Sequence, residues 1–265
     1  MTDLTLNDGR TMPQLGMGTF KIPDAHVAAI VRRGLDIGYR LVDTAAIYNN
    51  ERGVGDGYKG ADAFLTTKLW NDRHRDAEAA LDESLALLGV EAVDLYLIHW
   101  PVPAAGDYVG AWKSLVALRE AGKAKSIGVS NFLPEHLDAI IDATGVAPAV
   151  NQIELHPNFQ QRALRDYHAD KGIVTQSWSP LGQGGPLLKD PVIAGIAEKH
   201  GRSAAQVVIA WHLAHGLSVI PKAADAEHLS DNFASSDLTL DTEDMAAIDG
   251  LDREDGRIGP DPATF

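Results

Sequence analysis

The feature that most limits the possible folds of this chain is a regular alternation of strand-like and helix-like segments. Short apolar runs such as "VDLYLIHW" (93–100) are followed by or follow amphipathic stretches that end at a glycine, as in "DAEAALDESLALLG" (76–89). With "GMGTF" (16–20) counted as the first, eight strand-like runs occur, mostly separated by helices. This alternation predicts a parallel sheet, and eight units in 265 residues predict an α/β fold of the (β/α)8 TIM barrel type. No linker-like stretch divides the chain, so we expect residues 1–265 to form a single domain.

The segment 50–62 is the weakest part of this pattern. It contains Gly53, Gly55, Gly57 and Gly60, and glycine disfavours the interior of a helix. We therefore expect the second helix of the barrel to be short or missing. The following run "LTTKLW" (65–70) is intact and predicts a normal strand.

Charge and composition exclude several classes of function. The formal net charge is −14, which disfavours binding to nucleic acid or to an anionic membrane surface. The chain has no cysteine, so disulfides, thiolate nucleophiles and cysteine-ligated zinc are excluded. The amino terminus lacks a signal pattern, and no apolar run approaches the roughly 18 residues of a membrane span. These features predict a cytoplasmic protein.

Polar side chains stand at the end of nearly every expected strand. Parallel barrel strands present their carboxyl ends at one face, where active sites of this fold lie. One polar strand end would mean little, but so many together predict a site. The residues are Asp43, Lys68, His99, Ser130 with Asn131, Asn151 with Gln152, Trp178 and Lys222.

Four of the residues at this face suit the reduction of a carbonyl group. Hydride addition leaves an oxyanion that needs a proton, which Tyr48 can supply; a neighbouring Lys68 ammonium would lower the phenol pKa. Asp43 would hold Lys68 charged, and His99 would orient the carbonyl. Taken singly, Asp43 is more simply a turn cap, Tyr48 a loop aromatic and His99 a satisfied histidine. The joint pattern, with a buried Lys68 that needs a carboxylate partner, favours the catalytic interpretation.

The sequence also resembles a known family over nearly its whole length. The motifs that carry the resemblance are "GMGTFK", "LVDTAAIY", "TTKLWNDRHR", "VDLYLIHWP", "SIGVSNF", "AVNQIELHP", "QSWSPLGQG" and "VIPK". They are similar to those of the aldo-keto reductases, most closely the bacterial 2,5-diketo-D-gluconate reductases. The resemblance implies a monomeric (β/α)8 barrel that reduces aldehydes and ketones with NADPH. The catalytic tetrad of the family falls on Asp43, Tyr48, Lys68 and His99.

The resemblance also assigns cofactor contacts. Ser130, Asn131 and Gln152 match the residues that hold the nicotinamide carboxamide, and Trp178 matches the aromatic that stacks on its ring. "SPLGQG" (179–184) matches the loop over the pyrophosphate, through Ser179, Leu181, Gly182 and Gln183. The short "GMG" at 16–18 lacks the third glycine and the βαβ context of a Rossmann fingerprint.

The stretch "PKAADAEHLSDN" (221–232) departs from NADPH-using relatives. Lys222 and Asn232 keep cofactor-contact positions. However, Ala223 stands where a serine is common, Asp225 where a basic residue is common, and His228 where an arginine is common. Arginine is the preferred bidentate partner of a phosphate. One hypothesis is that NADH is tolerated or preferred; the alternative is that Asp225 only begins a helix, while Lys222 and His228 still hold the phosphate.

Three aromatic residues are expected around the substrate. Phe20, Trp70 and Trp100 would form an apolar wall, with Tyr108 as a further candidate, and the carboxyl-terminal loop 252–265 would lie near the mouth. Such a pocket suits a small-molecule carbonyl substrate, namely small keto-sugars, keto acids or aldehydes. No metal is expected.

Two other classes of function compete with this interpretation. One is a catalytically silent barrel of the same kind that binds a ligand or regulates a partner, against which the complete tetrad argues. The other is a metal-dependent hydrolase, because His212 and His215 in "WHLAH" have a spacing that suits metal ligands. They fall on an expected outer helix without a companion carboxylate, which disfavours a metal site.

Overall fold

Eight parallel strands form the centre of the molecule. The computed structural model describes residues 2–104 and 106–265. Each strand pairs with the next one in chain order, from β3 through to β10. Parallel bridges from Leu15 to Val219 and from Gly18 to Lys222 join the first strand to the last, which closes the barrel. The strands are β3 (Met17–Gly18), β4 (Leu41–Asp43), β5 (Phe64–Leu69), β6 (Val93–Ile98), β7 (Ala124–Ser130), β8 (Val150–Glu154), β9 (Val174–Trp178) and β10 (Ser218–Val219).

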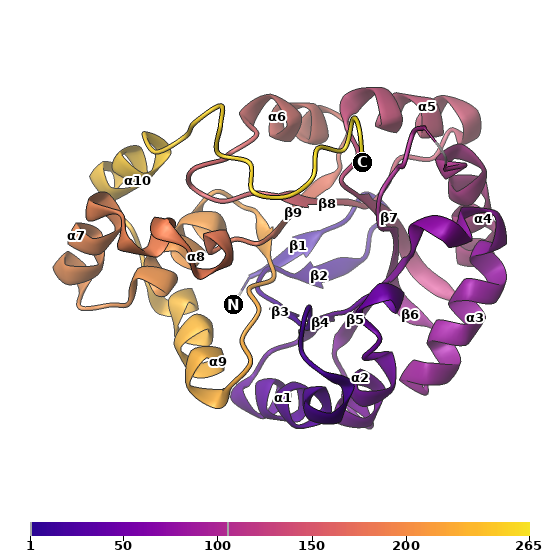
Figure 1. The fold of residues 1–265 in the computed structure, drawn as a ribbon, viewed down its shortest axis with the longest axis horizontal. Helices are drawn as coiled ribbons and strands as arrows, with labels where there is room; N and C mark the ends of the chain where they lie inside the picture. The colour runs from indigo at the N-terminus through magenta and orange to yellow at the C-terminus, as the bar shows by residue number, and fades with distance from the viewer. Residues whose placement is uncertain (1, 105) are drawn as a thin grey trace.

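Helices surround this sheet in the order that the sequence predicts (Figure 1). The α-helices are α1 (Asp24–Ile37), α2 (Glu51–Tyr58), α3 (Ala77–Leu88), α4 (Tyr108–Glu120), α5 (Pro134–Thr144), α6 (Arg162–Asp170), α7 (Pro191–His200), α8 (Ala204–Ala214), α9 (Ala226–Phe233) and α10 (Thr242–Asp249). Short 3-10 helices are η1 (Ala46–Tyr48), η2 (Asn71–Asp76), η3 (Gly182–Gly184), η4 (Pro186–Lys189) and η5 (Ala234–Asp237). The (β/α)8 barrel expected from the alternation is therefore confirmed. Among the described residues, none of the helices combines the length and apolarity that a membrane crossing demands.

Helix α2 is short but present, and its glycines explain how it fits. A Cβ atom on Gly53 would lie 2.4 Å from the Asp24 carbonyl oxygen of α1. A Cβ on Gly55 would lie 2.4 Å from the carbonyl oxygen of Leu88, the last residue of α3. The glycines that argue against a helix in the sequence thus let α2 approach the backbones of both neighbours. Close packing outweighs the entropic cost of glycine here.

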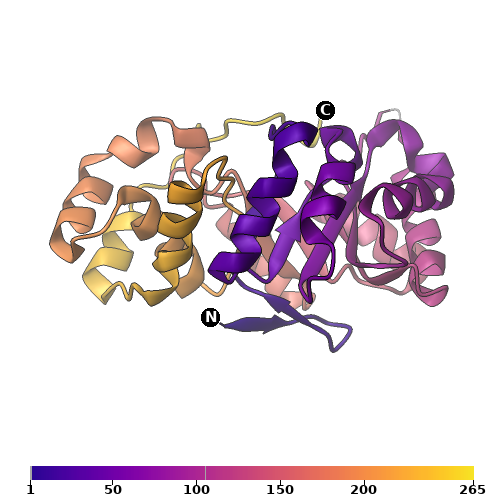
Figure 2. The ribbon, with the colours of Figure 1, turned by 90° about the horizontal axis from the view of Figure 1, so that it is seen from below.

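An amino-terminal hairpin was not expected from the sequence. Strands β1 (Asp3–Thr5) and β2 (Thr11–Pro13) pair in antiparallel fashion around a turn in which Gly9 has a φ of 84°. Figure 2 shows the hairpin at one end of the barrel and the carboxyl-terminal segment across the opposite end. Leu6 and Met12 are buried against apolar residues inside the barrel. The hairpin thus covers the amino-terminal end of the barrel, opposite the face at which the carboxyl ends of the strands lie.

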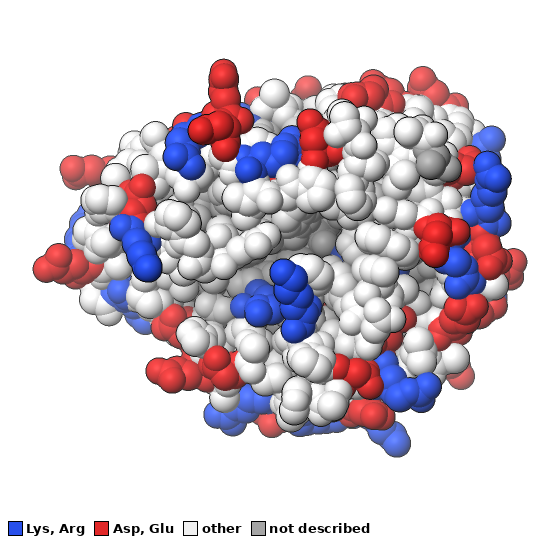
Figure 3. Space-filling model, in the orientation of Figure 1, with Lys and Arg blue, Asp and Glu red and all other residues white. Residues whose placement is uncertain are grey.

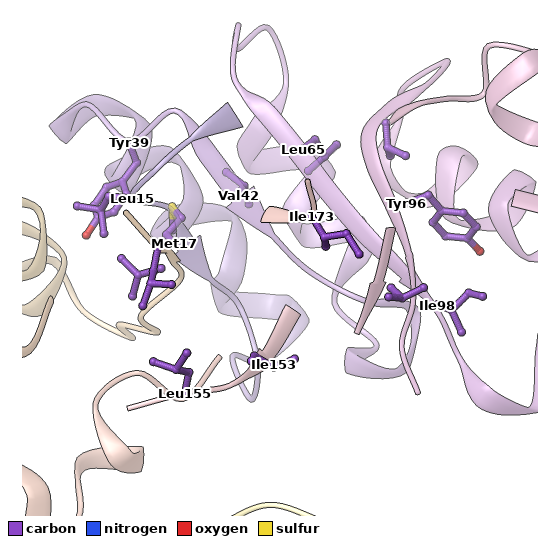
Figure 4. Packing of buried hydrophobic residues seen from close by; sticks show 14 of the residues in the cluster. Leu15, Met17, Tyr39, Val42, Leu65, Tyr96, Ile98, Ile153, Leu155 and Ile173 are labelled. Atoms are coloured by element: carbon purple, nitrogen blue, oxygen red, sulfur yellow. The ribbon is translucent and has the colours of Figure 1, made fainter. Parts of the chain in front are cut away.

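The core has two layers that follow the strand period of two. In β6, Leu95 and Leu97 belong to the cluster inside the barrel, whereas Tyr96 and Ile98 belong to the cluster between sheet and helices. Figure 4 shows ten labelled members of the outer cluster, contributed by neighbouring strands and by the segments that flank them. This packing fixes the strand ends, and therefore the polar residues on them.

Candidate active site

A buried ion pair lies at the centre of the carboxyl-terminal face of the barrel. Asp43 ends β4 and Lys68 lies in the adjacent strand β5. Lys68 Nζ donates to Asp43 Oδ1 at 2.6 Å and to the Thr44 carbonyl oxygen at 2.8 Å. The second carboxylate oxygen, Oδ2, accepts a hydrogen bond of 2.8 Å from Gln152 Nε2. Both oxygens of Asp43 are therefore committed, and the Lys68 ammonium is held in one place.

Burial and charge act in opposite directions on this pair. Burial raises the pKa of Asp43, and the Lys68 charge opposes that shift. Burial lowers the pKa of Lys68, and the carboxylates of Asp43 and Glu51 oppose it. Each charge of the pair is therefore favoured mainly by the presence of the other.

Tyr48 stands over this pair at the end of η1. The Lys68 Nζ atom lies 5.1 Å from the centre of its ring, and the His99 ring centre lies 5.8 Å away. Burial, and then the Asp43 charge, raise the pKa of the phenol well above its usual value. The expectation that Lys68 lowers this pKa is therefore wrong in its net direction, because Asp43 balances the lysine charge and burial dominates. Tyr48 is consequently held in its protonated form, the form that a proton donor needs.

His99 follows β6 and faces Tyr48 across the cavity. Burial, and then the Lys68 charge, lower its pKa well below the usual value, so the imidazole is neutral. Its Nδ1 atom has no hydrogen-bond partner among the described residues. The Trp70 ring packs edge-on against it at 5.1 Å. A neutral imidazole that lines the cavity suits the expected role of orienting a carbonyl oxygen.

The polar residues expected at the nicotinamide form one connected group. Ser130 Oγ donates to the Gln152 carbonyl oxygen at 2.8 Å, and Asn131 Nδ2 donates to Ser130 Oγ at 2.9 Å. Asn131 Oδ1 accepts from the Trp178 indole at 2.7 Å, which fixes the orientation of that ring. Gln152 Nε2 also donates to Gln176 Oε1 at 2.6 Å. The donors of this group are committed within the protein, so the group holds the Trp178 indole in one orientation beside amide oxygens that keep acceptor capacity for an amide-bearing ring.

The backbone near these residues adopts conformations that are unusual outside glycine. Asn131, Ser179 and Gln183 have φ values of 63°, 50° and 57°. Such left-handed positions cost energy and cluster at binding sites. Leu181 and Gly182 lie between Ser179 and Gln183 and form the turn that begins η3. The loop 179–184 therefore has the built-in strain that a dedicated binding loop shows.

The expected site residues surround a cavity of about 390 Å3. Phe20, Trp70 and Trp100 line it as expected, but Tyr108 does not: it packs on Phe132, with ring centres 5.6 Å apart, within the helical layer. Figure 3 shows a central hollow on this face, with acidic residues mostly at the periphery and a basic group at its rim. Lys68 lies behind Asp43 rather than on the surface of the cavity. The lining also includes Asp43, Tyr48, His99, Ser130, Asn131, Gln152, Trp178, Ser179 and Gln183.

Several residues of the site were missed from the sequence. Glu51 is buried beside β5 and accepts hydrogen bonds from Thr67 Oγ1 at 2.5 Å and Ser84 Oγ at 3.2 Å. Glu51 directly precedes Arg52 in a stretch that also contains Asp56 and Lys59, so no signal in the sequence singles it out. The cavity is also lined by Ile47 and Ile220, which were not expected, and by Ile258, Gly259 and Pro260 of the carboxyl-terminal loop that was expected near the mouth.

The residues expected near the adenosine phosphate lie outside this cavity. Lys222 is exposed after β10, Ala223 and Asn232 are buried, and His228 is exposed on α9. Asp225 is the N-cap of α9 and accepts from His228 N at 2.9 Å. Its other carboxylate oxygen lies 2.6 Å from His228 Nδ1. Asp225 is therefore a helix-start residue, as the alternative interpretation holds, and it pairs with the histidine that would contact the phosphate.

The histidine pair that suggested a metal lies elsewhere. His212 is buried in α8, and His215 Nε2 lies 2.8 Å from Asp249 Oδ1. Within residues 2–104 and 106–265, no group of three or more metal-ligating side chains occurs.

Comparison with known proteins relates this geometry to a family. The family model described as "Aldo/keto reductase family" matches residues 14–253. An aldo-keto reductase of Mycolicibacterium smegmatis is 50% identical, over 99% of this chain and 97% of that protein. Methylglyoxal reductase DkgA of Salmonella typhimurium is 48% identical, over 100% of this chain and 98% of its own length. A crystal structure of a Gox0644 variant in complex with NADPH superimposes with a TM-score of 0.97 at 52% identity, covering 100% of this chain and 98% of that one.

Proposed function

Because the chain belongs to the aldo/keto reductase family and is an NADP-dependent carbonyl reductase, we propose that it reduces small aldehydes and ketones at the cavity over Asp43. The observation that most strongly supports this function is that Tyr48 and His99 face one cavity, while the buried Lys68 lies behind it. The similarity to methylglyoxal reductases supports α-dicarbonyl compounds such as methylglyoxal within the substrate class. The relatives are named as reductases, so the catalytically silent alternative is not supported.

In the proposed reaction, the protein supplies the proton and the geometry. NADPH, when bound, supplies the hydride that adds to the carbonyl carbon. Tyr48 would donate its phenolic proton to the carbonyl oxygen, so that the C=O becomes an alcohol and the tyrosine becomes a phenolate. That phenolate must take up one proton from solvent before the next turnover. The Lys68 ammonium stabilises the phenolate that remains, and Asp43 holds that ammonium in place. His99 donates a hydrogen bond that orients the carbonyl oxygen before the transfer.

The proposed cofactor contacts follow the polar group and the strained loop. Ser130, Asn131 and Gln152 would bind the carboxamide of the nicotinamide, and the Trp178 indole would stack on the ring. The loop residues Ser179, Leu181, Gly182 and Gln183 would cover the pyrophosphate. Lys222, His228 and Asn232 would bind the adenosine end.

We propose that the enzyme uses NADPH and also tolerates NADH. Asp225 raises the pKa of His228, which favours a cationic imidazole near the phosphate. The same carboxylate adds a negative charge beside that imidazole, and Ala223 offers no hydroxyl. The clamp on the phosphate is therefore weaker than one built from arginine. Comparison of kcat/KM for NADPH and NADH tests this; a very large preference for either cofactor would contradict it.

The proposal also covers the oligomeric state, the domain organisation and the cellular location of the enzyme. The site is assembled within one chain, which supports a monomer, and no linker interrupts the barrel, which supports a single domain spanning 1–265. Reduction with NADPH requires a supply of the reduced dinucleotide, which the cytoplasm maintains, and we propose that the enzyme works there. Light scattering at several protein concentrations tests the monomer; a concentration-independent dimer mass would contradict it.

The direct test of the function is an assay of the purified protein with methylglyoxal and NADPH. We expect NADPH to be consumed in equal amount to the carbonyl reduced, and at an undiminished rate in the presence of a metal chelator. Failure to reduce any of a panel of aldehydes, dicarbonyls and keto-sugars would overturn the proposal.

A further inference from the structure

Glu154, the last residue of β8, lies beneath the carboxyl-terminal segment. Its side chain is 1% exposed. Oε1 accepts a hydrogen bond of 2.6 Å from the backbone N–H of Ile258, and Oε2 accepts one of 2.8 Å from that of Gly259. His156 Nε2 lies 3.2 Å from Oε1. A buried carboxylate thus binds two successive backbone amides more than a hundred residues away in the chain.

The backbone at Gly259 also rests on the indole of Trp178. A Cβ atom at this position would lie 2.5 Å from Trp178 Cη2 and 2.8 Å from Glu154 Oε2. Real Cβ atoms do not approach so closely, so only glycine fits between the indole and the carboxylate. The contact that holds the tail is therefore continuous with the ring that is proposed to stack on the nicotinamide.

The clamped stretch forms part of the cavity wall. Ile258, Gly259 and Pro260 line the cavity, and the terminal residue Phe265 packs on Trp100 with ring centres 4.5 Å apart. In Figure 1 the carboxyl-terminal segment, drawn in yellow, crosses the face of the barrel on which the strands end. The tail therefore narrows the space between the aromatic wall and the tetrad.

We propose that Glu154 is a positioning residue that clamps the segment 252–265 over the cavity and thereby favours small carbonyl substrates over bulky ones. The predicted substrate preference rests on the proposed function, whereas the contact of Glu154 with the tail rests on geometry alone. Hydrogen bonds to a buried carboxylate are stronger than neutral ones, so the two amides hold the tail closed. Without the carboxylate, the wall formed by Ile258 and Pro260 moves away. A small substrate then loses contacts, whereas a bulky one gains room.

Glu154→Gln is the informative substitution, because it keeps the shape of the side chain but replaces one acceptor oxygen by an NH2 group that faces a backbone N–H. In the full-length protein saturated with NADPH, we expect the amides of residues 258 and 259 to exchange about tenfold faster with solvent. We also expect KM for methylglyoxal to rise about tenfold with a smaller change in kcat, and the ratio of kcat/KM to shift toward benzaldehyde. Glu254→Gln makes the same chemical change at an exposed position of the tail and should alter none of these quantities.

Gly259→Ala perturbs the same contact from the side of the tail. It should reproduce both the faster amide exchange and the change in preference toward benzaldehyde, even if Glu154→Gln does not fold. Unchanged exchange at residues 258 and 259 in both variants would overturn the clamp. Faster exchange with an unchanged preference between methylglyoxal and benzaldehyde would overturn its role in selection. If the wild-type protein reduces neither carbonyl, the proposed function fails, while the exchange measurement still decides whether Glu154 holds the tail.

Discussion

Lys68 Nζ lies 2.6 Å from Asp43 Oδ1, with both side chains sealed from solvent at 0% and 2% exposure. Attraction within such a pair must offset the desolvation of two charges. The second acceptor of the ammonium, the Thr44 carbonyl oxygen, and the Gln152 amide on Asp43 Oδ2 help to meet this cost. Loss of this pair should therefore be visible in the stability of the fold as well as in the proposed catalysis.

Asp43→Asn should destabilise the fold, because it leaves the Lys68 ammonium buried without its carboxylate. Breaking a buried pair in this way lowers the free energy of unfolding by about 3–5 kcal/mol. Asp3→Asn is the matched control, since it removes the exposed pair of Asp3 with Arg40, which should contribute at most about 1 kcal/mol. Urea unfolding measures both. Equal losses in the two variants would contradict the account of the buried pair.

Gly55→Ala tests the packing of helix α2 against α3. The new Cβ would meet the carbonyl oxygen of Leu88 at 2.4 Å and its carbonyl carbon at 2.6 Å, and backbone atoms cannot move aside cheaply. We expect a loss of about 1–3 kcal/mol in the free energy of unfolding. Gly195→Ala in α7, where a Cβ would meet nothing within 4 Å, should instead stabilise by about 0.5–1 kcal/mol. A stabilising Gly55→Ala would show that α2 packs more loosely than described.

His168 should make the protein sensitive to mild acid. Burial lowers its pKa from 6.5 to about 4, and it bonds to Asn151 Nδ2 and Thr175 Oγ1 at 2.9 and 2.8 Å. Since the folded-state pKa is depressed, the unfolded chain takes up the proton first. Stability that is fully present above pH 6.5 is therefore lost as pH falls toward about 4, by up to about 3 kcal/mol.

The measurement for this prediction is urea unfolding across that range of pH. In His168→Gln, which retains one donor and one acceptor, the corresponding part of the pH dependence should disappear. His26→Gln, at an exposed position of α1, should leave the profile as in the wild type. An unchanged pH dependence in His168→Gln would show that other groups cause the acid sensitivity.

His228→Arg should sharpen the preference for NADPH. An arginine at this exposed position of α9 offers a permanently charged, bidentate partner for a phosphate, which the imidazole paired with Asp225 does not. We expect Kd for NADPH to fall about tenfold, with Kd for NADH unchanged. Quenching of tryptophan fluorescence measures both constants. Equal changes for the two cofactors would show that residue 228 does not contact the phosphate.

The barrel and the arrangement of its polar strand ends could be predicted because both follow from short-range patterns. The alternation of strands and helices fixes a parallel sheet, and parallel strands bring their carboxyl ends together. Asp43, His99 and Gln152 are therefore neighbours in space although they lie far apart in the sequence. The motif resemblance adds Tyr48, which lies beyond a strand end and which no periodicity singles out.

The features that could not be predicted depend on long-range packing. The hairpin is recognisable only once Leu6 and Met12 are seen to fill the end of the barrel. Gly55 disfavours a helix locally, and only the neighbouring Leu88 backbone explains its presence. The direction of the Tyr48 pKa depends on burial and on the nearness of Asp43 to Lys68, neither of which the sequence specifies. The contact of Glu154 with the tail joins segments that no local pattern relates.

The central claim is that Tyr48 donates the proton to the carbonyl oxygen, and Tyr48→Phe tests it most directly. The substitution removes only the phenolic oxygen and leaves the ring between Phe20 and His99. We predict that kcat/KM for methylglyoxal falls by about 10²–10⁴-fold while Kd for NADPH, measured by tryptophan fluorescence, is unchanged. Turnover at the wild-type rate, with NADPH still bound, would contradict it.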